Sequence, residues 1–200
     1  MKVRLYSPED EQKVLDTMSK AFMDDPLYKI FVQDKANRMM FLRRFMKFRL
    51  KYGLKKGIVF VTDDCRGISV WIKPGQKMSA ADVITLGGLY PMLKYCSSKE
   101  RKTITDFNSF ADGEREKALK TPAWHLSPIA VSPEFQNKGY GRMLMEKGME
   151  AVKNSQTPCC LETQSSENIH FYENFGFAVK SQAVYTPADL KSYVMVFENQ

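Results

Sequence analysis

Apolar and polar positions repeat along the chain with two periods, which separate predicted helices from predicted strands. Helical spacing begins after Ser7 and Pro8, a typical N-cap and first-turn pair, and it is broken at Asp24-Asp25-Pro26. The predicted helices cover about residues 7–23, 26–32, 35–52, 139–154 and 166–175. The predicted strands cover about residues 3–6, 58–64, 68–75, 123–131, 158–163, 178–186 and 192–198.

The order of these segments indicates the class of fold. Residues 58–64 and 68–75 are rich in β-branched residues and are separated by a short turn, which predicts a hairpin. After residue 123 the order is strand, helix, strand, helix, strand, strand, so a helix crosses between two parallel strands. We therefore expect an α/β protein that forms one domain over residues 1–200.

A segment of different character separates the two halves of this pattern. Residues 75–121 lack strand signals and have helical spacing, with breaks at Gly87-Gly88 and Pro91. They contain more apolar residues than a connection needs, namely Leu89, Tyr90, Met92, Leu93, Tyr95, Phe107 and Phe110. This predicts a helical insertion at about residues 75–122.

Composition agrees with an ordinary globular protein, because 44% of the residues are apolar and 26% are charged. The longest apolar stretches have the length of strands, so we expect no membrane-spanning segment. The first residues turn acidic where a secretory signal would be apolar, which favours a cytoplasmic protein. The cysteines form no CxxC pair, so we expect reduced residues and no metal site. They are Cys65, Cys96, Cys159 and Cys160.

The formal net charge of +7 permits either nucleic-acid binding or a small anionic ligand. The main basic cluster, residues 43–56, lies in a stretch where Phe41, Phe45, Phe48 and Leu50 recur at helical spacing. This pattern favours an amphipathic surface helix over a nucleic-acid face. We expect no nucleic-acid partner, and the excess charge then suits a phosphorylated cofactor.

The turn after residue 131 is a candidate phosphate site. Gly139 and Gly141 stand at the predicted start of a helix, where free amides attract anions and missing β-carbons allow close approach. Lys138 and Arg142 bring positive charge to the same place. Neither the dinucleotide motif GxGxxG nor the nucleotide-triphosphate motif GK[ST] is present. The turn is therefore a phosphate turn of a third kind.

The pattern Gln136-x-x-Gly139-x-Gly141 after a strand ending in "IAVSP" resembles the acetyl-CoA loop of the GNAT N-acetyltransferase superfamily. A second stretch, "LETQSSENIHFYENFGF", resembles the other motif of that family, with Asn168 and Tyr172 on one helical face. The resemblance implies acetyl-CoA as cosubstrate, with its pantetheine arm paired to the preceding strand. The residues it assigns to the cofactor are Ile129, Ala130, Val131, Gln136, Asn137, Lys138, Gly139, Tyr140, Gly141, Arg142 and Asn168.

The resemblance also implies a GNAT fold. This is a single mixed, mostly antiparallel sheet with helices on both faces and a splay between strands 4 and 5. It covers residues 1–73 loosely and residues 123–198 well. Within the superfamily, "ISVWIKPG", "PAWHLSPIAVSPEFQNKGYG" and "CLETQSSENIHFYENFGF" most resemble puromycin N-acetyltransferase-like members. Those members share an insertion at about the same place, which we expect to determine the substrate.

Pro128 gives the predicted strand 123–131 a special feature. Proline has no N–H for the sheet, so pairing must break there and a bulge is expected. The backbone of Ile129 and Val131 would then turn toward the cofactor. The amide of Ile129 is our first choice for polarising the thioester carbonyl.

Tyr172 is the candidate general acid for the departing thiolate, a role that the resemblance implies. A phenol has a reference pKa near 10, close enough to that of a thiol for proton transfer. The alternative is an aromatic residue that only packs the helix on the sheet. Asn168 would bond the cofactor arm, or else cap its own helix.

His125 is the candidate general base, because an imidazole can accept the proton of an amine directly or through water. Protein-modifying members of the superfamily have a glutamate at the matching position, and puromycin-type members have an aromatic residue. The alternative for His125 is a packed, hydrogen-bonded strand residue. Strand alternation places it on one face with Ser127, Ile129 and Val131, opposite Trp124, Leu126 and Ala130.

Three acidic residues are further candidates for recognising the substrate amine. They are Glu162 and the pair Asp24-Asp25, although helix termination before Pro26 explains the pair better. Adjacent Cys159 and Cys160 suggest a cysteine nucleophile, but their strand lies in a sheet interior and we discount it.

These observations leave three functions open. The first is an enzyme that transfers acetyl directly from acetyl-CoA to a primary amine of a small molecule, acting as a monomer or homodimer. The second is a protein or peptide N-acetyltransferase, and the third is a non-catalytic regulator that binds acyl-CoA. Tyr172 and Asn168 together argue against the regulator, and the apolar insertion favours a small-molecule pocket.

Overall fold

The structure is a computed structural model and describes residues 2–199. The helices are α1 (Glu11–Ala21), α2 (Pro26–Phe31), α3 (Lys35–Lys56), α4 (Ala80–Thr85), α5 (Leu89–Tyr95), α6 (Ser98–Ala118), α7 (Tyr140–Asn154) and α8 (Glu167–Glu173). The strands are β1 (Val3–Leu5), β2 (Gly57–Thr62), β3 (Gly67–Ile72), β4 (Trp124–Val131), β5 (Cys159–Thr163), β6 (Ala178–Tyr185) and β7 (Leu190–Phe197). Every predicted element is present, with its ends shifted by a few residues.

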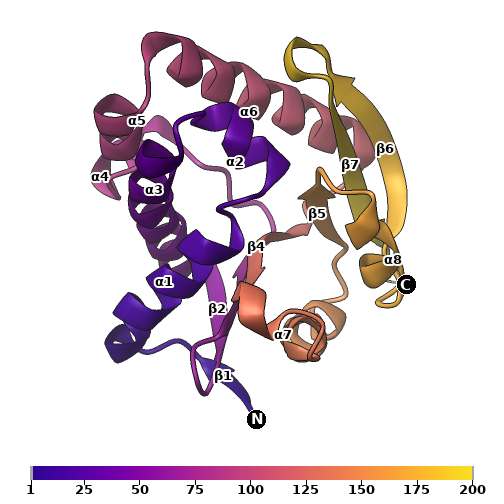
Figure 1. The fold of residues 1–200 in the computed structure, drawn as a ribbon. Coiled ribbons are helices and arrows are strands. Elements are labelled where there is room, and N and C mark those ends of the chain that lie inside the picture. Colours follow the sequence, from indigo (N-terminus) through magenta and orange to yellow (C-terminus); the bar gives the residue numbers. More distant parts are fainter. Residues whose placement is uncertain (1, 200) are drawn as a thin grey trace.

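The strands form one seven-stranded sheet in the order β1-β2-β3-β4-β5-β7-β6. All neighbours are antiparallel except β4 and β5, which are parallel and are connected by α7. The predicted hairpin, β2 with β3, and the predicted helical crossover are both confirmed. Figure 1 shows α1 and α3 on one side of the strands and α7 on the other. The predicted mixed sheet with helices on both faces is therefore correct.

One face of the sheet is covered by α1 and α3. These two helices and the strands β2 and β3 share one apolar cluster, called the α1–α3 cluster below. It contains the fully buried residues Val14 and Met18 of α1 and Phe41 and Leu42 of α3. Val14 and Met18 are four places apart, which puts them on one side of α1. Most lysines and arginines of α3 are exposed or half-buried, whereas Arg38 is buried.

The opposite face is covered by α7, whose predicted apolar stripe is confirmed. A second apolar cluster, called the α7-side cluster below, contains Leu144, Met145 and Met149 of α7 packed with Trp71 of β3. Gly148 belongs to this stripe because a β-carbon there would lie 1.9 Å from the Trp71 ring. Trp71 therefore sets how closely α7 approaches the sheet.

The segment predicted as an insertion contains α4, α5 and α6, and it is called the insertion below. Asp82 of α4 is buried and forms an ion pair with Lys55 of α3 at 2.7 Å, which anchors the start of the insertion. α6 then runs across the molecule from α2 to the β6–β7 pair (Figure 1). Its Phe107 is buried in the α1–α3 cluster, whereas Leu93 of α5 is 60% exposed. The insertion is thus partly core and partly surface.

β4 and β5 separate after two residue pairs, which confirms the predicted splay. Trp124 pairs with Cys159 and His125 with Cys160, after which β5 continues along β7 alone. The backbone of β4 beyond His125 therefore has no strand on its β5 side. We call this space the gap. The turn that joins β4 to α7 and contains Gly139 is called the glycine turn, and it lies at the open end of the gap.

The predicted bulge in β4 is present, and it changes which side chains share a face. β3 and β4 shift register between Ser69 and Trp71, where β4 has one more residue than β3. As a result Ile129 and Val131 pack on the α7 side with Leu126, while Ala130 packs on the α1–α3 side. The predicted alternation was wrong, because one extra residue exchanges the two faces of everything beyond it.

Asp10 stabilises the chain entry into α1. Both of its carboxylate oxygens accept hydrogen bonds from Arg4, at 2.7 and 2.8 Å, and one also accepts from the Ser7 amide. The bonds from Arg4 hold the pKa of Asp10 well below its usual range, against the opposing effect of burial. Because this pKa is depressed, its stabilisation is present above the pKa of the unfolded chain and is lost as pH falls.

We expect Asp10→Asn to lower the free energy of unfolding at pH 7 by about 1 to 3 kcal/mol, the usual contribution of charge-assisted hydrogen bonds. The difference from the parent should shrink below about pH 4, where the unfolded carboxyl protonates. Urea unfolding at pH 7 and pH 3 measures both. Asp63→Asn is the control, because Asp63 lies 3.7 Å from Arg4 and is half exposed. An equal loss at both pH values would contradict the charge explanation.

Within residues 2–199, no helix combines the length and the apolar character needed to cross a membrane.

Candidate functional site

The glycine turn connects β4 to α7 through backbone conformations that few residues adopt. Asn137 has φ +58° and Gly139 has φ +85°, both in the left-handed region. Gly139 is the N-cap of α7, and its carbonyl accepts the first helical bond, from the Met143 amide. The amides of residues 140–142 precede that bond, so they have no partner inside the helix. Free amides at a helix N-terminus attract anions, and a phosphate site at this turn stays a prediction.

The two glycines are needed for different reasons. Nothing lies within 4 Å of a β-carbon placed on Gly139, so only its positive φ requires glycine. A β-carbon on Gly141 would lie 3.3 Å from the ring of Phe171 on α8. Gly139 therefore shapes the turn, and Gly141 allows α8 to approach it.

Cations surround the turn, and one of them was not predicted. Arg142 is 75% exposed and donates to Glu146 of its own helix at 2.9 Å. The Lys138 ammonium lies 5.1 Å from the centroid of the Phe135 ring, and the Arg66 guanidinium lies 3.9 Å from it. Arg66 comes from the turn between β2 and β3, and no feature of the sequence connects it to the glycine turn.

Two residues assigned to the cofactor hold the turn in place with their side chains. The Tyr140 hydroxyl donates to Asp64 at 2.7 Å, and the Gln136 amide donates to the Val131 carbonyl at 3.2 Å. Burial favours a raised pKa for Asp64, but its hydrogen bonds, including that from Tyr140, outweigh burial and lower it. The side chains of Tyr140 and Gln136 thus tie the turn to the β2–β3 hairpin and to β4.

The backbone of β4 presents alternate residues to the gap. The Ser132 amide donates to the Arg66 carbonyl at 2.9 Å, so Ser132 faces β3. Backbone groups alternate along an antiparallel ladder, so Ala130 also faces β3, while Ile129 and Val131 face the gap. The gap is thus bordered by the backbone of Ile129 and Val131 and not by that of Ala130, and the Val131 carbonyl already accepts from Gln136.

Tyr172 lies on α8 in the α7-side cluster and is 7% exposed. Burial raises the pKa of its hydroxyl to about 12, so the phenol stays protonated at neutral pH. Asn168, one turn earlier, is exposed, and its amide donates to the Thr163 hydroxyl at 3.4 Å. Asn168 therefore lies beside the end of β5, and Tyr172 lies one turn further along α8.

His125 lies on the other side of the sheet, in an ionic chain. Its Nε2 is 2.7 Å from Oε2 of Glu162, and Oε1 of Glu162 accepts a hydrogen bond from Arg115 of α6. Arg115 also pairs with Asp112 at 2.7 Å. Glu162 is thus occupied by two partners, and it does not offer a free carboxylate to a substrate amine.

His125 and Tyr172 lie on opposite faces of the sheet. His125 pairs with Ile72, a member of the α1–α3 cluster, whereas Tyr172 belongs to the α7-side cluster. A base and an acid on opposite sides of a reacting carbon suit a single displacement, in which one group enters as another leaves. The side of the gap that carries His125 is called the acceptor side below.

Arg49 is a second residue of the acceptor side that the sequence did not reveal. It reaches from α3 to β4 and donates to both the carbonyl and the hydroxyl oxygen of Ser127. Asp25, by contrast, caps α2 by accepting from the amides of Leu27 and Tyr28. α1 ends at Ala21, so the predicted helix termination before Pro26 is confirmed, and Asp25 begins the next helix.

The four cysteines are buried and unpaired. Burial raises the pKa of Cys159 and of Cys160, the two that were weighed as nucleophiles. A thiol in such surroundings stays protonated and is a poor nucleophile.

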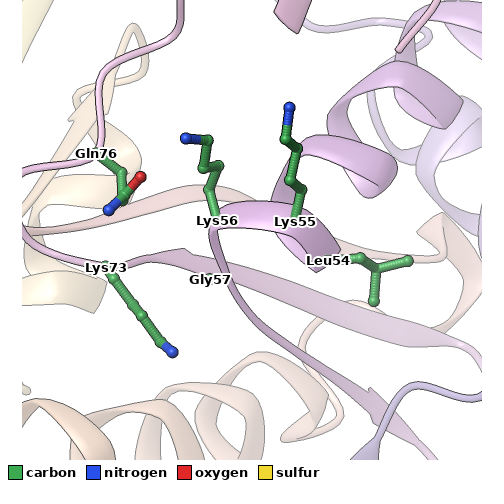
Figure 2. Close-up of a pocket in the computed structure, with 6 residues that line it drawn as sticks. All are labelled: Leu54, Lys55, Lys56, Gly57, Lys73 and Gln76. Carbon is green, nitrogen blue, oxygen red and sulfur yellow. The ribbon is translucent and has the colours of Figure 1, made fainter. Parts of the chain in front are cut away.

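A cavity of about 350 Å³ lies outside this site, where α3 passes into β2. Figure 2 shows its lining, in which Lys55, Lys56 and Lys73 extend from two segments beside Gln76. None of the predicted site residues contributes to it. The cavity is therefore distinct from the gap.

Comparisons with known proteins agree with this geometry. Residues 100–179, which contain β4, the glycine turn and α8, match the family described as "Acetyltransferase (GNAT) domain". An uncharacterized N-acetyltransferase of Schizosaccharomyces pombe is 29% identical over 198 residues, covering 94% of this chain and 78% of that protein.

Solved structures share the fold over the whole chain. A protein of Corynebacterium glutamicum, described as histone acetyltransferase HPA2 and related acetyltransferase, has a TM-score of 0.68 at 18% identity, covering 98% of this chain and 94% of the other. Arylalkylamine N-acetyltransferase 2 of Aedes aegypti has a TM-score of 0.62 at 15% identity, covering 100% and 99%. At these identities the likeness concerns the fold alone. The domain match over residues 100–179 and the curated relative support an acetyltransferase domain of the GNAT type, and the solved structures support its fold.

Proposed function

We propose that this protein is an N-acetyltransferase that moves the acetyl group of acetyl-CoA directly to a primary amine of a small molecule. The observation that carries the proposal is the gap between β4 and β5, with the glycine turn at its open end. The turn offers free amides for the pyrophosphate, and Ile129 and Val131 offer backbone groups for the pantetheine arm. An extended arm would lie beside β4 as an added strand.

Each chemical need of the reaction has a candidate residue. The amine nitrogen attacks the thioester carbonyl carbon, whose oxygen the Ile129 amide would polarise. His125 takes the proton that the amine loses as the new carbon–nitrogen bond forms. Tyr172 gives a proton to the thiolate as the carbon–sulfur bond breaks. No covalent acyl-enzyme is required, in keeping with the buried, protonated cysteines.

The choice of a small molecule over a protein rests on the insertion and on the puromycin-type resemblance. α6 brings Arg115 to Glu162, the partner of His125, so an inserted helix reaches the acceptor side, where an open peptide groove would be needed for a protein substrate. The relatives named above include proteins described as acting on histones and on arylalkylamines, and they do not choose between these substrates.

The proposal is tested by measuring thiol release from acetyl-CoA with a panel of acceptors. The panel should contain puromycin, other aminonucleosides, polyamines, arylalkylamines and lysine peptides, with the acetylated product identified by mass. Turnover with a small amine and none with peptides is the expected result. Turnover with peptides alone would favour a protein acetyltransferase, and CoA binding without any turnover would favour a regulator.

The affinity for CoA should depend on salt through the cations of the turn. Replacing Lys138 and Arg142 with glutamine should weaken CoA binding at low ionic strength and flatten its decrease with added salt. Calorimetry at several salt concentrations measures this. Lys147→Gln is the control, since Lys147 lies farther along α7 and pairs with Glu150. An unaltered salt dependence in the double variant would place the phosphates elsewhere.

A further inference from the structure

Arg115 is the residue through which the insertion reaches the candidate base. It lies near the end of α6 and is 27% exposed. Its Nε donates to Glu162 on β5, and its Nη2 donates to Asp112 one turn earlier in α6. The guanidinium thus bonds to its own helix through Asp112 and to the sheet through Glu162.

Glu162 is largely buried and has both oxygens occupied, one by Arg115 and one by His125. Burial alone would raise the pKa of Glu162, but the charges and hydrogen bonds of His125 and Arg115 outweigh it, and the pKa is lowered. Glu162 is therefore an ionised carboxylate, which can only accept hydrogen bonds.

The ionised state of Glu162 decides the tautomer of His125. Because the carboxylate cannot donate, the Nε2 atom at 2.7 Å must carry the proton. Whenever the ring is neutral, its lone pair then belongs to Nδ1. No hydrogen bond joins Nδ1 to another residue in the described part of the chain, 2–199. His125 therefore has a basic nitrogen that the protein itself leaves unused.

We propose that Arg115 is a positioning residue, which holds Glu162 so that His125 keeps its Nδ1 lone pair for the acceptor amine. The inference rests on the proposed function in taking His125 as the base. It assigns the insertion a part in catalysis beyond covering the substrate. In the reaction, Nδ1 accepts the amine proton, and the resulting imidazolium is stabilised by the Glu162 carboxylate on its other side.

Removing Arg115 should disturb this arrangement in a specific way. Without Arg115, fewer interactions oppose the effect of burial on the pKa of Glu162, so this pKa rises and the carboxyl ionises less readily. A protonated Glu162 donates to Nε2, which moves the ring proton to Nδ1 and removes the base. We expect Arg115→Met to lower kcat by about 10²-fold, the order of loss expected when a reacting group is misplaced. The KM for acetyl-CoA should stay within a factor of about two, since Arg115 does not face the glycine turn.

The decisive readout is ¹⁵N NMR of the imidazole rings, which reports the tautomer without any substrate. The chain has two histidines, His125 and the exposed His170, so His170→Gln assigns the signals. We expect the parent to hold His125 with its proton on Nε2, and Arg115→Met to shift it toward Nδ1. Arg115→Lys should restore the parental tautomer in part, because an ammonium keeps the charge but loses the fixed geometry of the guanidinium.

Arg101→Met is the matched control. Arg101 lies on the same helix and donates to the Cys96 carbonyl and the Ser98 hydroxyl, so its loss weakens α6 without touching Glu162. An Arg115→Met protein with the parental His125 tautomer would overturn the inference, as would the same tautomer shift in Arg101→Met. His125→Gln tests the proposed base separately: full activity in that variant refutes the base, while the NMR result still decides whether Arg115 sets the ring.

Discussion

Tyr172→Phe is expected to lower kcat by about 10²- to 10⁴-fold, the usual loss when a general acid is removed. We expect the lower end of this range, because burial raises the pKa of Tyr172 to about 12 and so makes it a weaker acid than a free phenol. The ring remains, so its packing in the α7-side cluster is kept. The KM for acetyl-CoA should therefore change little, since the hydroxyl acts only as the carbon–sulfur bond breaks.

The control for this experiment is Tyr185→Phe. Tyr185 is also buried, but it packs against Phe107 in the α1–α3 cluster, away from Tyr172. It loses the same atom and should keep the parental kcat. Steady-state kinetics of both variants with one amine acceptor give the comparison. A Tyr172→Phe protein that acetylates at the parental rate would make Tyr172 a packing residue only.

Gly139→Val should weaken CoA binding by about 5- to 150-fold, or abolish it. A β-branched residue at φ +85° is strained by about 1 to 3 kcal/mol. The turn escapes this strain by changing shape, and the amides that would hold the pyrophosphate then lose their common direction. A cost of 1.4 kcal/mol corresponds to about a tenfold change in affinity. Isothermal titration calorimetry with CoA measures the effect.

Gly87 is a close match for Gly139. It has the same φ of +85° and, like Gly139, nothing within 4 Å of an added β-carbon, but it lies in the insertion after α4. Gly87→Val should lose a similar amount of stability and keep the parental affinity for CoA. Equal CoA affinities in the two folded variants would remove the pyrophosphate from the glycine turn.

Local patterns predicted the elements and half of the site. The stripe that includes Leu144 and Met149 identified α7 and its buried face, and Gly139 and Gly141 marked the turn before it, because these signals involve residues close together in the chain. The break in strand pairing at Pro128 was also predictable, because a proline has no N–H to donate to a sheet. Where a signal is local, the sequence was sufficient.

Contacts between distant segments were not predicted. Arg66, Arg49 and Arg115 come from the β2–β3 turn, α3 and α6, and nothing in their own neighbourhoods distinguishes them from other surface arginines. The faces beyond Pro128 were assigned wrongly for a related reason. A bulge was expected, but the number of extra residues in it depends on the pairing with β3, and that number decides whether Ile129 points to one face or the other.

The course of α6 has a consequence for how such a protein can change its substrate over evolution. The glycine turn and α8, which we propose to face the cofactor, are separate in sequence from α6, so the insertion can diverge while the proposed cofactor segment is inherited unchanged. Divergence is nevertheless restricted at one point, because the ion pair between Arg115 and Glu162 joins the insertion to β5. An insertion taken from a relative would have to supply a cation at the position of Arg115. Otherwise the buried carboxylate of Glu162 would have to be replaced as well.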